Sequence, residues 1–146
     1  MSAEDILPKD KQPTLRMVPM PADTNAVGNI FGGWIMAQVD IAASIPAFRR
    51  AGGRVVTVAV NSFSFRQPVF VGDVVSFYAD VVAVGHTSLR VFVECFSERI
   101  VHGEHKVVKV TEATLTYVAV DKNNRPRLVP PDTDNPSLGS DNSGLG

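Results

Sequence analysis

The stretch GGWIMAQVDIAASIPAFRRAGG, residues 32–53, decides the fold. It is rich in Ala, Ile and Met and lacks the alternation of a strand, and Arg49 and Arg50 precede its final glycines, which is typical of the end of a helix. We therefore expect a helix, and because it is apolar on nearly every side we expect it to be enclosed on most sides. Pro46 removes one main-chain hydrogen bond and predicts a kink or a tightened last turn.

Strand patterns dominate the chain on either side of this helix. A first strand is predicted over residues 14–20, where two prolines stop it. After the helix, four long runs rich in Val, Phe, Thr and Tyr cover residues 55–65, 74–84, 89–100 and 107–120, the last two joined by a predicted connection over residues 101–106. The order β-α-β-β-β-β predicts an antiparallel sheet with one buried helix, which is the α+β class.

The length of 146 residues fits one domain, which we place at residues 13–127. Residues 1–12 are polar and contain Pro8, with Pro13 directly after them, and residues 128–146 are dominated by Pro, Gly, Ser, Asn and Asp. Segments of this composition have little to bury, so both ends are predicted to be flexible.

Charge and cysteine content narrow the class of protein. Lys and Arg total 14 against 15 for Asp and Glu, so the net charge of -1 provides no field that attracts nucleic acid or an anionic membrane. The single cysteine cannot form an intramolecular disulfide, and the first residues do not have the pattern of a secretion signal. No apolar run is long enough to span a membrane. A cytoplasmic protein with neither nucleic acid nor membrane as its partner is predicted.

The sheet itself predicts self-association. One helix covers only part of one face, and the run over residues 55–65 has few charges that would discourage pairing with another chain. We expect a two-fold dimer with this strand or a neighbour at the junction.

Asp40 is the first candidate catalytic residue. It lies in the middle of an apolar helix, where an unpaired carboxylate is costly, and no Lys or Arg stands three or four residues away on either side. Ser44 is one turn further along and shares the face of Asp40, so its hydroxyl can bond the carboxylate or a water beside it.

The start of the helix is the second candidate. Gly32 and Gly33 leave the first N–H groups uncovered at the positive end of the helix dipole, where an oxyanion binds well. Asn25 upstream can offer its amide to the same oxygen or orient water. Gly32 and Asp40 are eight residues apart, or about 12 Å along one helix, which is too far for both to reach one carbonyl group. Antiparallel helices of two paired subunits would bring the glycines of one to the aspartate of the other, giving two composite sites.

A thioester suits such a sparse site. Its thiol leaving group has a pKa of about 8.5 and departs with little help from an acid. Asp40 is then either a general base acting on water or a nucleophile that forms an anhydride, and the sequence leaves both open.

Other polar clusters have weaker patterns. His102 and His105 flank Glu104, but no third ligand is apparent, so we predict no metal site. Cys95 has no neighbouring base and is interpreted as a structural thiol. His86 lies in a turn beside Thr87, Ser88 and Arg90, and this turn is either solvated or in contact with phosphate. The arginines 49, 50 and 54 either complement the negative end of the helix or bind nucleotide phosphates.

The run MPADTNAVGNIFGGWIMAQVDIA, followed by GRVVTVAVNSFSFRQPVFVGDVVSFYADVVAVGHTS, closely resembles the YciA-type acyl-CoA thioesterases, from about Leu15 to Arg127. The resemblance implies a hotdog fold, a curved antiparallel sheet around a central helix, with dimers that assemble into hexamers as trimers of dimers. It implies that Asp40 is the catalytic acid, that Asn25 corresponds to the family's loop asparagine, and that the amides of Gly32 and Gly33 polarise the carbonyl. Ser44 resembles a hydroxyl that more distant relatives place one turn after the acid.

The same resemblance implies a substrate-binding set. The strand segment from Thr57 through Val58 to Asn61 corresponds to the strand beside the thioester, and the turn GHTS corresponds to a contact with coenzyme A. The predicted set of substrate and coenzyme A contacts is therefore Arg54, Thr57, Val58, Asn61, His86, Thr87, Ser88 and Arg90. Asn29 and Asn61 stand where acidic residues are frequent in relatives, and Pro46 is unusual in this helix.

Hydrolysis of acyl-CoA to a free acid and coenzyme A is the predicted function, and no cofactor is expected, because coenzyme A is part of the substrate. The alternative is a non-catalytic protein that binds or senses acyl-CoA. A dehydratase or hydratase of the same fold is disfavoured, because that chemistry needs a histidine near the thioester and none occurs between Met1 and Val84.

Overall fold

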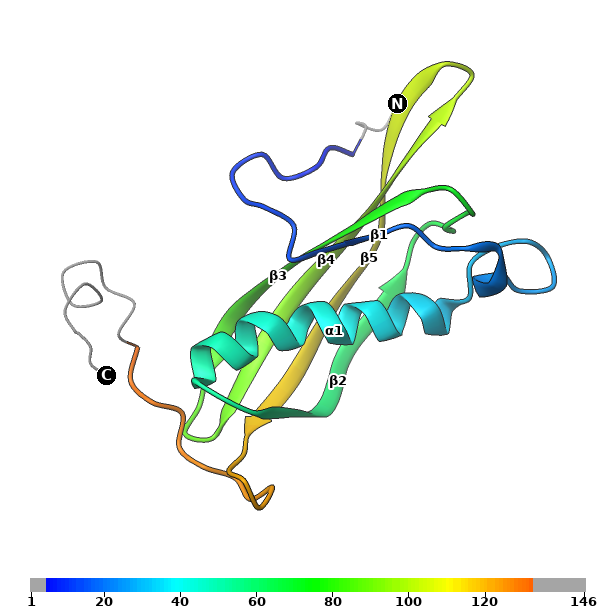
Figure 1. The fold of residues 1–146 in the computed structure, drawn as a ribbon. Coiled ribbons are helices and arrows are strands. Elements are labelled where there is room, and N and C mark those ends of the chain that lie inside the picture. The colour runs from blue at the N-terminus through cyan, green and yellow to red at the C-terminus, as the bar shows by residue number, and fades with distance from the viewer. Residues whose placement is uncertain (1–4, 133–146) are drawn as a thin grey trace.

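One helix lies across a five-stranded antiparallel sheet in the computed structural model, which describes residues 5–132 (Figure 1). The elements are β1 (Leu15–Met17), the 3-10 turn η1 (Pro21–Asp23), α1 (Gly32–Ala51), β2 (Val55–Phe65), β3 (Val74–Val84), β4 (Ser88–Val101) and β5 (Glu104–Ala119). This arrangement confirms the predicted α+β class and the hotdog fold. The predicted flexibility of the ends falls partly on residues 1–4 and 133–146, which lie outside the described residues.

The strands run in the order β1-β3-β4-β5-β2, so β2 forms one edge of the sheet. Side chains on the inner face alternate with outward ones and pack against α1, as period-two patterning requires. The buried residues of α1 are Ile35, Val39, Ala42, Ala43, Ala47 and Ala51. Small side chains on this side of the helix let its backbone approach the sheet closely, and they face Phe77, Leu89, Val91, Val93, Leu115 and Tyr117 in one core.

The element ends differ from the predictions in two places. The first strand is only three residues long, because Pro19 and Pro21 withdraw the chain from the ladder. The predicted connection over residues 101–106 is wrong, because β4 and β5 continue to a turn of only His102 and Gly103. Both turn residues have positive φ, 51° and 79°, which matches the twist of a tight hairpin. The β4–β5 hairpin therefore projects beyond the other strands (Figure 1).

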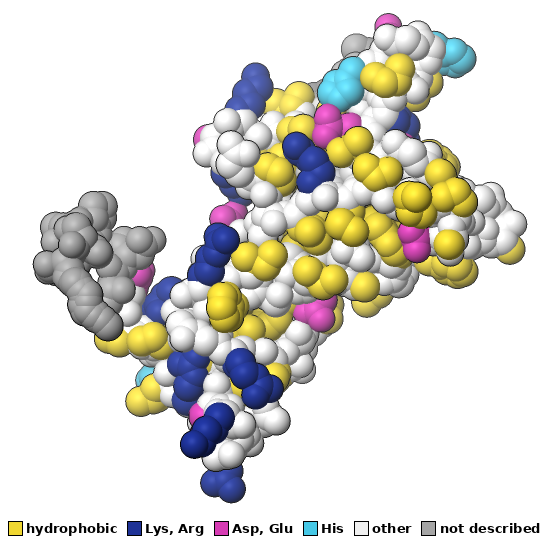
Figure 2. Space-filling view, viewed as in Figure 1, with side chains coloured by type: hydrophobic (Ala, Val, Ile, Leu, Met, Phe, Trp, Pro, Cys, Tyr) yellow, Lys and Arg dark blue, Asp and Glu magenta, His cyan; other side chains and the backbone are white. Residues whose placement is uncertain are grey.

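The expected enclosure of α1 is wrong within a single chain. The helix turns Met36, Ile41 and Phe48 away from the sheet, and these side chains are 43%, 49% and 55% exposed. Along the neighbouring edge, Val58 and Val60 of β2 are also exposed. Hydrophobic side chains are spread over the face formed by α1 and β2 (Figure 2). We call this surface, made of the exposed apolar residues of α1 and β2, the open apolar face.

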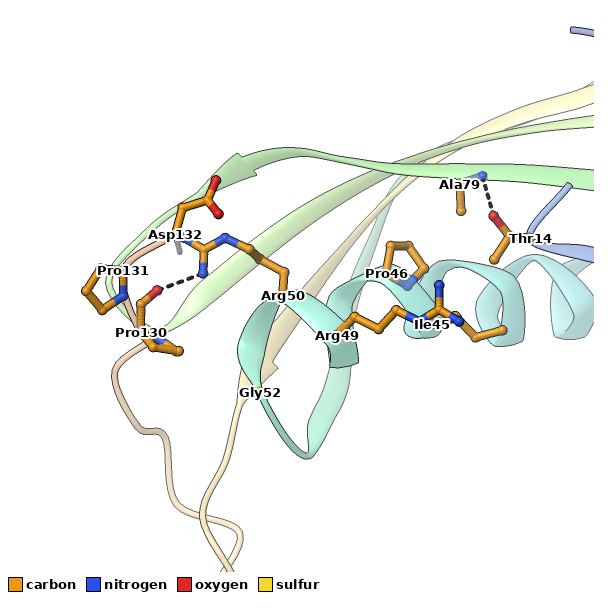
Figure 3. A pocket seen from close by; sticks show the side chains of 10 residues that line it. All are labelled: Thr14, Ile45, Pro46, Arg49, Arg50, Gly52, Ala79, Pro130, Pro131 and Asp132. Carbon is orange, nitrogen blue, oxygen red and sulfur yellow. Dashed lines mark hydrogen bonds between the residues drawn. The ribbon is translucent and has the colours of Figure 1, made fainter. Parts of the chain in front are cut away.

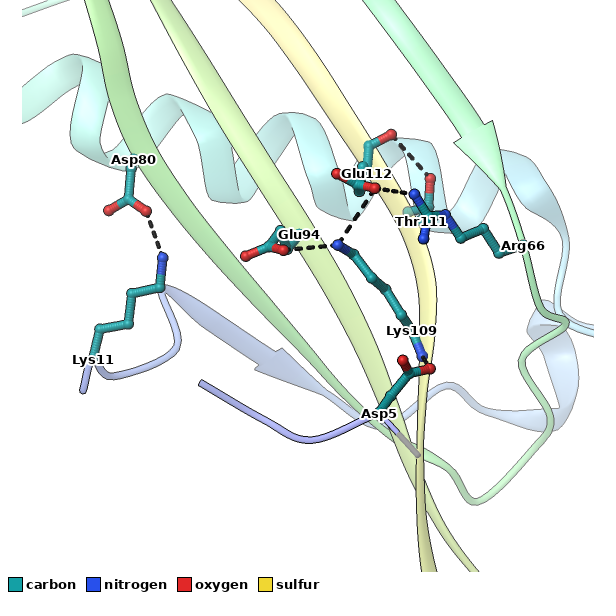
Figure 4. Close-up of polar contacts among 8 residues, drawn as sticks. All are labelled: Asp5, Lys11, Arg66, Asp80, Glu94, Lys109, Thr111 and Glu112. Carbon is teal, nitrogen blue, oxygen red and sulfur yellow. Dashed lines mark hydrogen bonds and ion pairs between the residues drawn. The ribbon is translucent and has the colours of Figure 1, made fainter. Parts of the chain in front are cut away.

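The opposite face of the sheet is covered by charged pairs and by the N-terminal residues (Figure 4). Lys109 Nζ lies 2.8 Å from a carboxylate oxygen of Glu94, and Lys109 N donates to Asp5 at 2.7 Å. Lys11 pairs with Asp80 at 2.7 Å. Residues 5–12 thus include two contacts with the sheet, while their flexibility stays a prediction.

A buried ion pair holds the turn between β2 and β3 beside the start of α1. Asp73 is 3% exposed and accepts hydrogen bonds from Ser97 at 2.7 Å and from Arg99 at 2.8 Å. In the same turn, the carbonyl of Val69 accepts the N–H of Ile30 at 2.9 Å. The turn and the loop before α1 are therefore fixed to each other.

Candidate active site

Asp40 lies halfway along α1 with its carboxylate at the edge of the open apolar face. Oδ1 accepts two hydrogen bonds, from the hydroxyl of Thr57 at 2.7 Å and from that of Tyr117 at 2.6 Å. Tyr117 Oη also lies 2.8 Å from the main-chain oxygen of Asp40. Within residues 5–132 the other oxygen, Oδ2, has no hydrogen-bond partner. Asp40 is half-buried in the single chain, and two hydroxyl groups hold one oxygen of its carboxylate.

The β2–β5 pairing places these hydroxyls together. Thr57 and Tyr117 are opposite each other in the antiparallel register, so their side chains leave the sheet side by side. Burial, and next the hydrogen bond to Asp40, raise the pKa of Tyr117 well above its usual value, although the hydrogen bond from Thr57 opposes this. Tyr117 therefore stays protonated and donates to the carboxylate.

Tyr117 is the residue of this site that the sequence analysis missed. The available signal was a tyrosine inside the predicted strand 107–120, because a buried tyrosine hydroxyl requires a polar partner. Asp40 was the one carboxylate in the apolar helix that could accept such a hydrogen bond. The sequence does not predict the hydrogen bond between Tyr117 and Asp40, because this contact depends on how the sheet curves around the helix.

The start of α1 forms a second part of the site. A cavity of about 320 Å³ lies there, lined by Asn25, Asn29, Ile30, Gly32, Ile35, Phe65, Arg66, Gln67, Pro68, Val69 and Val110. The structure thus brings Asn25 and Gly32 to one cavity. No acceptor for the N–H groups of Gly32 and Gly33 is found among the described residues. A side chain at position 32 would meet the ring of Phe65 at 3.2 Å, so glycine keeps this approach open.

Asn25 shapes the loop that leads into this cavity. Its Oδ1 accepts the N–H groups of Val27 and Asn29, both at 3.0 Å. The side-chain oxygen is occupied by the loop, which leaves the NH₂ group as the end of Asn25 that can donate to a ligand.

Within one chain the two parts of the site stay separate. Asp40 is not among the residues that line the cavity at the helix start, which is consistent with the spacing of about 12 Å along α1. Ser44, predicted to bond the carboxylate, instead donates its hydroxyl to the carbonyl of Ile41 at 2.7 Å. The structure therefore does not join Ser44 to Asp40.

Several predicted coenzyme A contacts lie together at the other end of the sheet. Arg54 donates to the side chain of Asn124 at 2.6 Å, and its carbonyl accepts the N–H of Val120 at 3.0 Å. The neighbouring Ala119 donates its N–H to the carbonyl of Thr87 at 2.8 Å. Arg54 and the turn at residues 85–88 are thus connected through the end of β5.

The remaining members of the predicted set are distributed over both faces. His86 is exposed, and the carbonyl of Ser88 at the base of the same turn accepts an N–H at 2.8 Å. Val58 is exposed on β2, within the open apolar face. Asn61 accepts a hydrogen bond from Thr116 at 2.6 Å on the face away from α1. The exposed Arg90 is opposite Thr116 in the ladder, so Asn61 and Arg90 are not brought to Asp40 within this chain.

A larger cavity, of about 740 Å³, lies beside the C-terminal end of α1 (Figure 3). Arg49 and Arg50 line it together with Pro130, and Arg50 Nη1 donates to the carbonyl of Pro130 at 2.7 Å. Arg50 therefore fastens residues after β5 to the helix end, and both arginines lie where cations complement the helix dipole.

The weaker candidates show structural roles. In the described part of the chain, no group of three or more His, Cys, Asp or Glu is placed to hold a metal. His105 Nε2 lies 3.0 Å from a carboxylate oxygen of Glu98 on the projecting hairpin. Cys95 is buried in the core, and burial raises the pKa of its thiol. Among residues 5–132 there is also no helix that is long and apolar enough to cross a membrane.

Comparisons with known proteins identify the family of the chain. A family model described as the thioesterase superfamily matches residues 27–104, more than half of the chain. Acyl-CoA thioester hydrolase YciA of Escherichia coli K12 is 48% identical over 119 residues, which cover 80% of this chain and 89% of that relative.

Solved structures give the same result. A hexameric hotdog fold thioesterase of Campylobacter jejuni superposes with a TM-score of 0.80 at 40% identity, covering 90% of this chain and 97% of that one. An aspartate-to-alanine mutant of a hexameric broad specificity acyl-coenzyme A thioesterase superposes with a TM-score of 0.80 at 43% identity, covering 88% and 93%. The chain therefore belongs to the thioesterase superfamily and, within it, to the YciA-type acyl-CoA thioester hydrolases.

Proposed function

We propose that this protein hydrolyses acyl-CoA to a carboxylic acid and coenzyme A at a site shared by two copies of the chain. The observation that carries the proposal is the state of Asp40, whose Oδ1 is held by two hydroxyls while Oδ2 is left without a partner beside the open apolar face. A carboxylate prepared in this way is suited to act on a group that lies against that face.

The chemistry follows from the oxygen that is left. Oδ2 of Asp40 either removes a proton from water that attacks the carbonyl carbon, or attacks that carbon itself to form an anhydride that water then hydrolyses. In both routes the C–S bond breaks, one water is consumed, and the thiolate takes up a proton. The oxygen of water enters the acid when water attacks the acyl carbon; if water opens the anhydride at the aspartyl carbon, it enters Asp40 while Oδ2 leaves with the acid. The uncovered N–H groups of Gly32 and Gly33 and the side-chain amide of Asn25 stabilise the negative charge that develops on the carbonyl oxygen.

The two halves of this site require a partner. Because Asp40 and the helix start are separated within one chain, the aspartate of one copy would meet the glycines of another across the open apolar face. The exposed edge of β2 and the exposed apolar side of α1 support a dimer in which β2 strands pair and the helices lie antiparallel. The solved relatives are hexameric, and we infer a trimer of such dimers here.

Coenzyme A would be held by its phosphates. Arg54 and the turn with the exposed His86 and the half-buried Thr87 and Ser88 form a connected polar end of the sheet, where a guanidinium and hydroxyls suit phosphate oxygens. We propose no metal and no cofactor, since coenzyme A is part of the substrate. The cytoplasmic location stays a prediction, and fractionation of native cells would test it.

The replacement Asp40→Asn tests the proposal. Asparagine keeps an oxygen for Thr57 and Tyr117 but is neither a base nor a nucleophile, so kcat for thiol release from acyl-CoA should fall by at least about a hundredfold. The matched control is Asp80→Asn on the opposite face, which pairs with Lys11 and should retain full turnover.

Two results would contradict the proposal. Turnover that survives Asp40→Asn would remove Asp40 from the mechanism. Tight binding of acyl-CoA by the unaltered protein without thiol release would favour the binding or sensing protein instead. Thiol release measured across acyl chain lengths would at the same time define the preferred substrate.

A further inference from the structure

We infer that Tyr117 is a positioning residue for the hydrolysis proposed above, because it fixes Oδ1 of Asp40 and so assigns Oδ2 as the atom that reacts. Tyr117 comes from β5, 77 residues after Asp40 in the chain. The inference rests on the proposed function and adds a specific role within it.

The geometry fixes the carboxylate relative to the helix. Tyr117 Oη lies 2.6 Å from Oδ1 and 2.8 Å from the main-chain oxygen of Asp40, so one hydroxyl spans both ends of the same residue. Turning the carboxylate plane about its last bond would break this contact, whereas a half turn would only exchange two equivalent oxygens. The contact therefore favours one orientation of the carboxylate plane, in which one oxygen is bonded to Tyr117 and the other is left to react.

Tyr117 and Thr57 differ in how firmly they are held. Thr57 lies on the edge strand β2 and is exposed, so the partner strand of a dimer approaches it directly. Tyr117 is 1% exposed on β5, which has strands on both sides and α1 above it. The tyrosine is thus the anchor that stays in place whether or not a partner is bound, and the threonine completes the pair.

The proton of Tyr117 remains available for this role. Burial disfavours the phenolate, and the adjacent carboxylate disfavours it further, so the pKa of Tyr117 is raised well above its usual value. The residue is therefore a neutral donor, and its proton is available to the hydrogen bond with Oδ1 of Asp40.

The chain contains a matched control for this tyrosine. Of its two tyrosines, Tyr78 is also buried, at 2% exposure, but it lies on the outer face of the sheet against Phe96, with ring centroids 5.9 Å apart. In the described residues its hydroxyl has no hydrogen-bond partner. Tyr78→Phe and Tyr117→Phe therefore remove the same atom from two buried rings, one beside Asp40 and one far from it.

The experiment compares both variants in the full-length protein. Tyr117→Phe should lower kcat for acyl-CoA about 10- to 100-fold with little change in KM, because a misdirected carboxylate affects the reaction and not the contacts of coenzyme A. Tyr78→Phe should retain the kcat of the unaltered protein. An unchanged kcat in Tyr117→Phe, or an equal loss in both variants, would overturn the inference.

A second measurement is independent of turnover. Urea unfolding of Tyr117→Phe should show a lower midpoint in the natural background and a smaller decrease in the Asp40→Ala background, because the bonded partner is then already absent. Equal decreases in both backgrounds would refute the Tyr117–Asp40 coupling even if the protein proved to have no hydrolase activity. Absence of thiol release by the unaltered protein would refute the proposed function instead, so the two failures are distinguishable.

Discussion

Asn25 illustrates how one side chain divides its two ends between structure and chemistry. Its oxygen accepts hydrogen bonds from the N–H groups of Val27 and Asn29 in the loop. We propose that its NH₂ group donates a hydrogen bond to a ligand in the cavity at the helix start. The replacement Asn25→Asp keeps both loop hydrogen bonds, removes the donor and adds a negative charge. We expect kcat for thiol release to fall about a hundredfold, as for the loss of one oxyanion donor.

The control for this change is Asn29→Asp, which introduces the same charge into the same cavity. The N–H of Asn29 holds the loop, and that main-chain group is retained in the variant. Steady-state kinetics should show turnover close to that of the unaltered protein. Equal losses in the two variants would mean that charge in the cavity, and not the donor of Asn25, controls the rate.

At the same scale, the sequence singled out Asp40 as a candidate and missed its hydrogen-bond partner Tyr117 for a physical reason. An isolated carboxylate in an apolar helix is visible locally, because its cost depends on its immediate neighbours. The contact with Tyr117 depends on the register of β2 against β5 and on the path of α1 over the sheet. Such a long-range relation has no local signature, and neither does the hydrogen bond of Ser44 to Ile41, which replaced the predicted one.

At the scale of elements, periodicity predicted the helix and the long strands well, and local turn chemistry decided the errors. The left-handed Gly52, with φ of 72°, ends α1 where the predicted glycine stop stands. The polar sequence around His102 suggested a longer connection, yet two residues with positive φ suffice to close the hairpin. Periodicity does not define the order of strands in the sheet. The observed order places β2 at one edge.

The edge position of β2 leads to a prediction about assembly. Val58 is 54% exposed on this strand, and a lysine there would place a charge where a partner strand must pack. Val58→Lys should therefore shift the protein toward monomers in sedimentation and abolish thiol release in parallel. Val82→Lys on β3, at a side chain that is 57% exposed, is the control and should change neither property. A monomeric Val58→Lys protein with full activity would contradict the shared site.

At the scale of the whole molecule, the open apolar face supports the prediction that the chain self-associates. A helix that is apolar on nearly every side finds cover on only one side of the fold, and exposed apolar area of this kind marks a contact with another protein. The sequence had predicted both enclosure and self-association. Enclosure of α1 is wrong for the single chain, whereas its exposed apolar side chains support self-association. A partner chain would cover the side of α1 that the sheet does not.

A mixture of two inactive variants tests whether each site draws on two chains. Asp40→Asn and Asn25→Asp chains, produced together, should form mixed dimers that contain one intact site each. Random pairing would restore about a quarter of the activity of the unaltered protein. If each site lay within one chain, every site would carry a defect, and the mixture would be as inactive as its components.

The buried position of Cys95 has a practical consequence for all of these measurements. Its sulfur lies inside the core, with its proton firmly retained, and it is the sole thiol of the polypeptide. A colorimetric disulfide reagent added to the native enzyme would meet no reactive sulfhydryl, so any yellow colour that develops reports product alone. Once the protein unfolds, the reagent would react with the thiol of Cys95. Absorbance in the absence of substrate would therefore measure the fraction of enzyme that has unfolded during an assay.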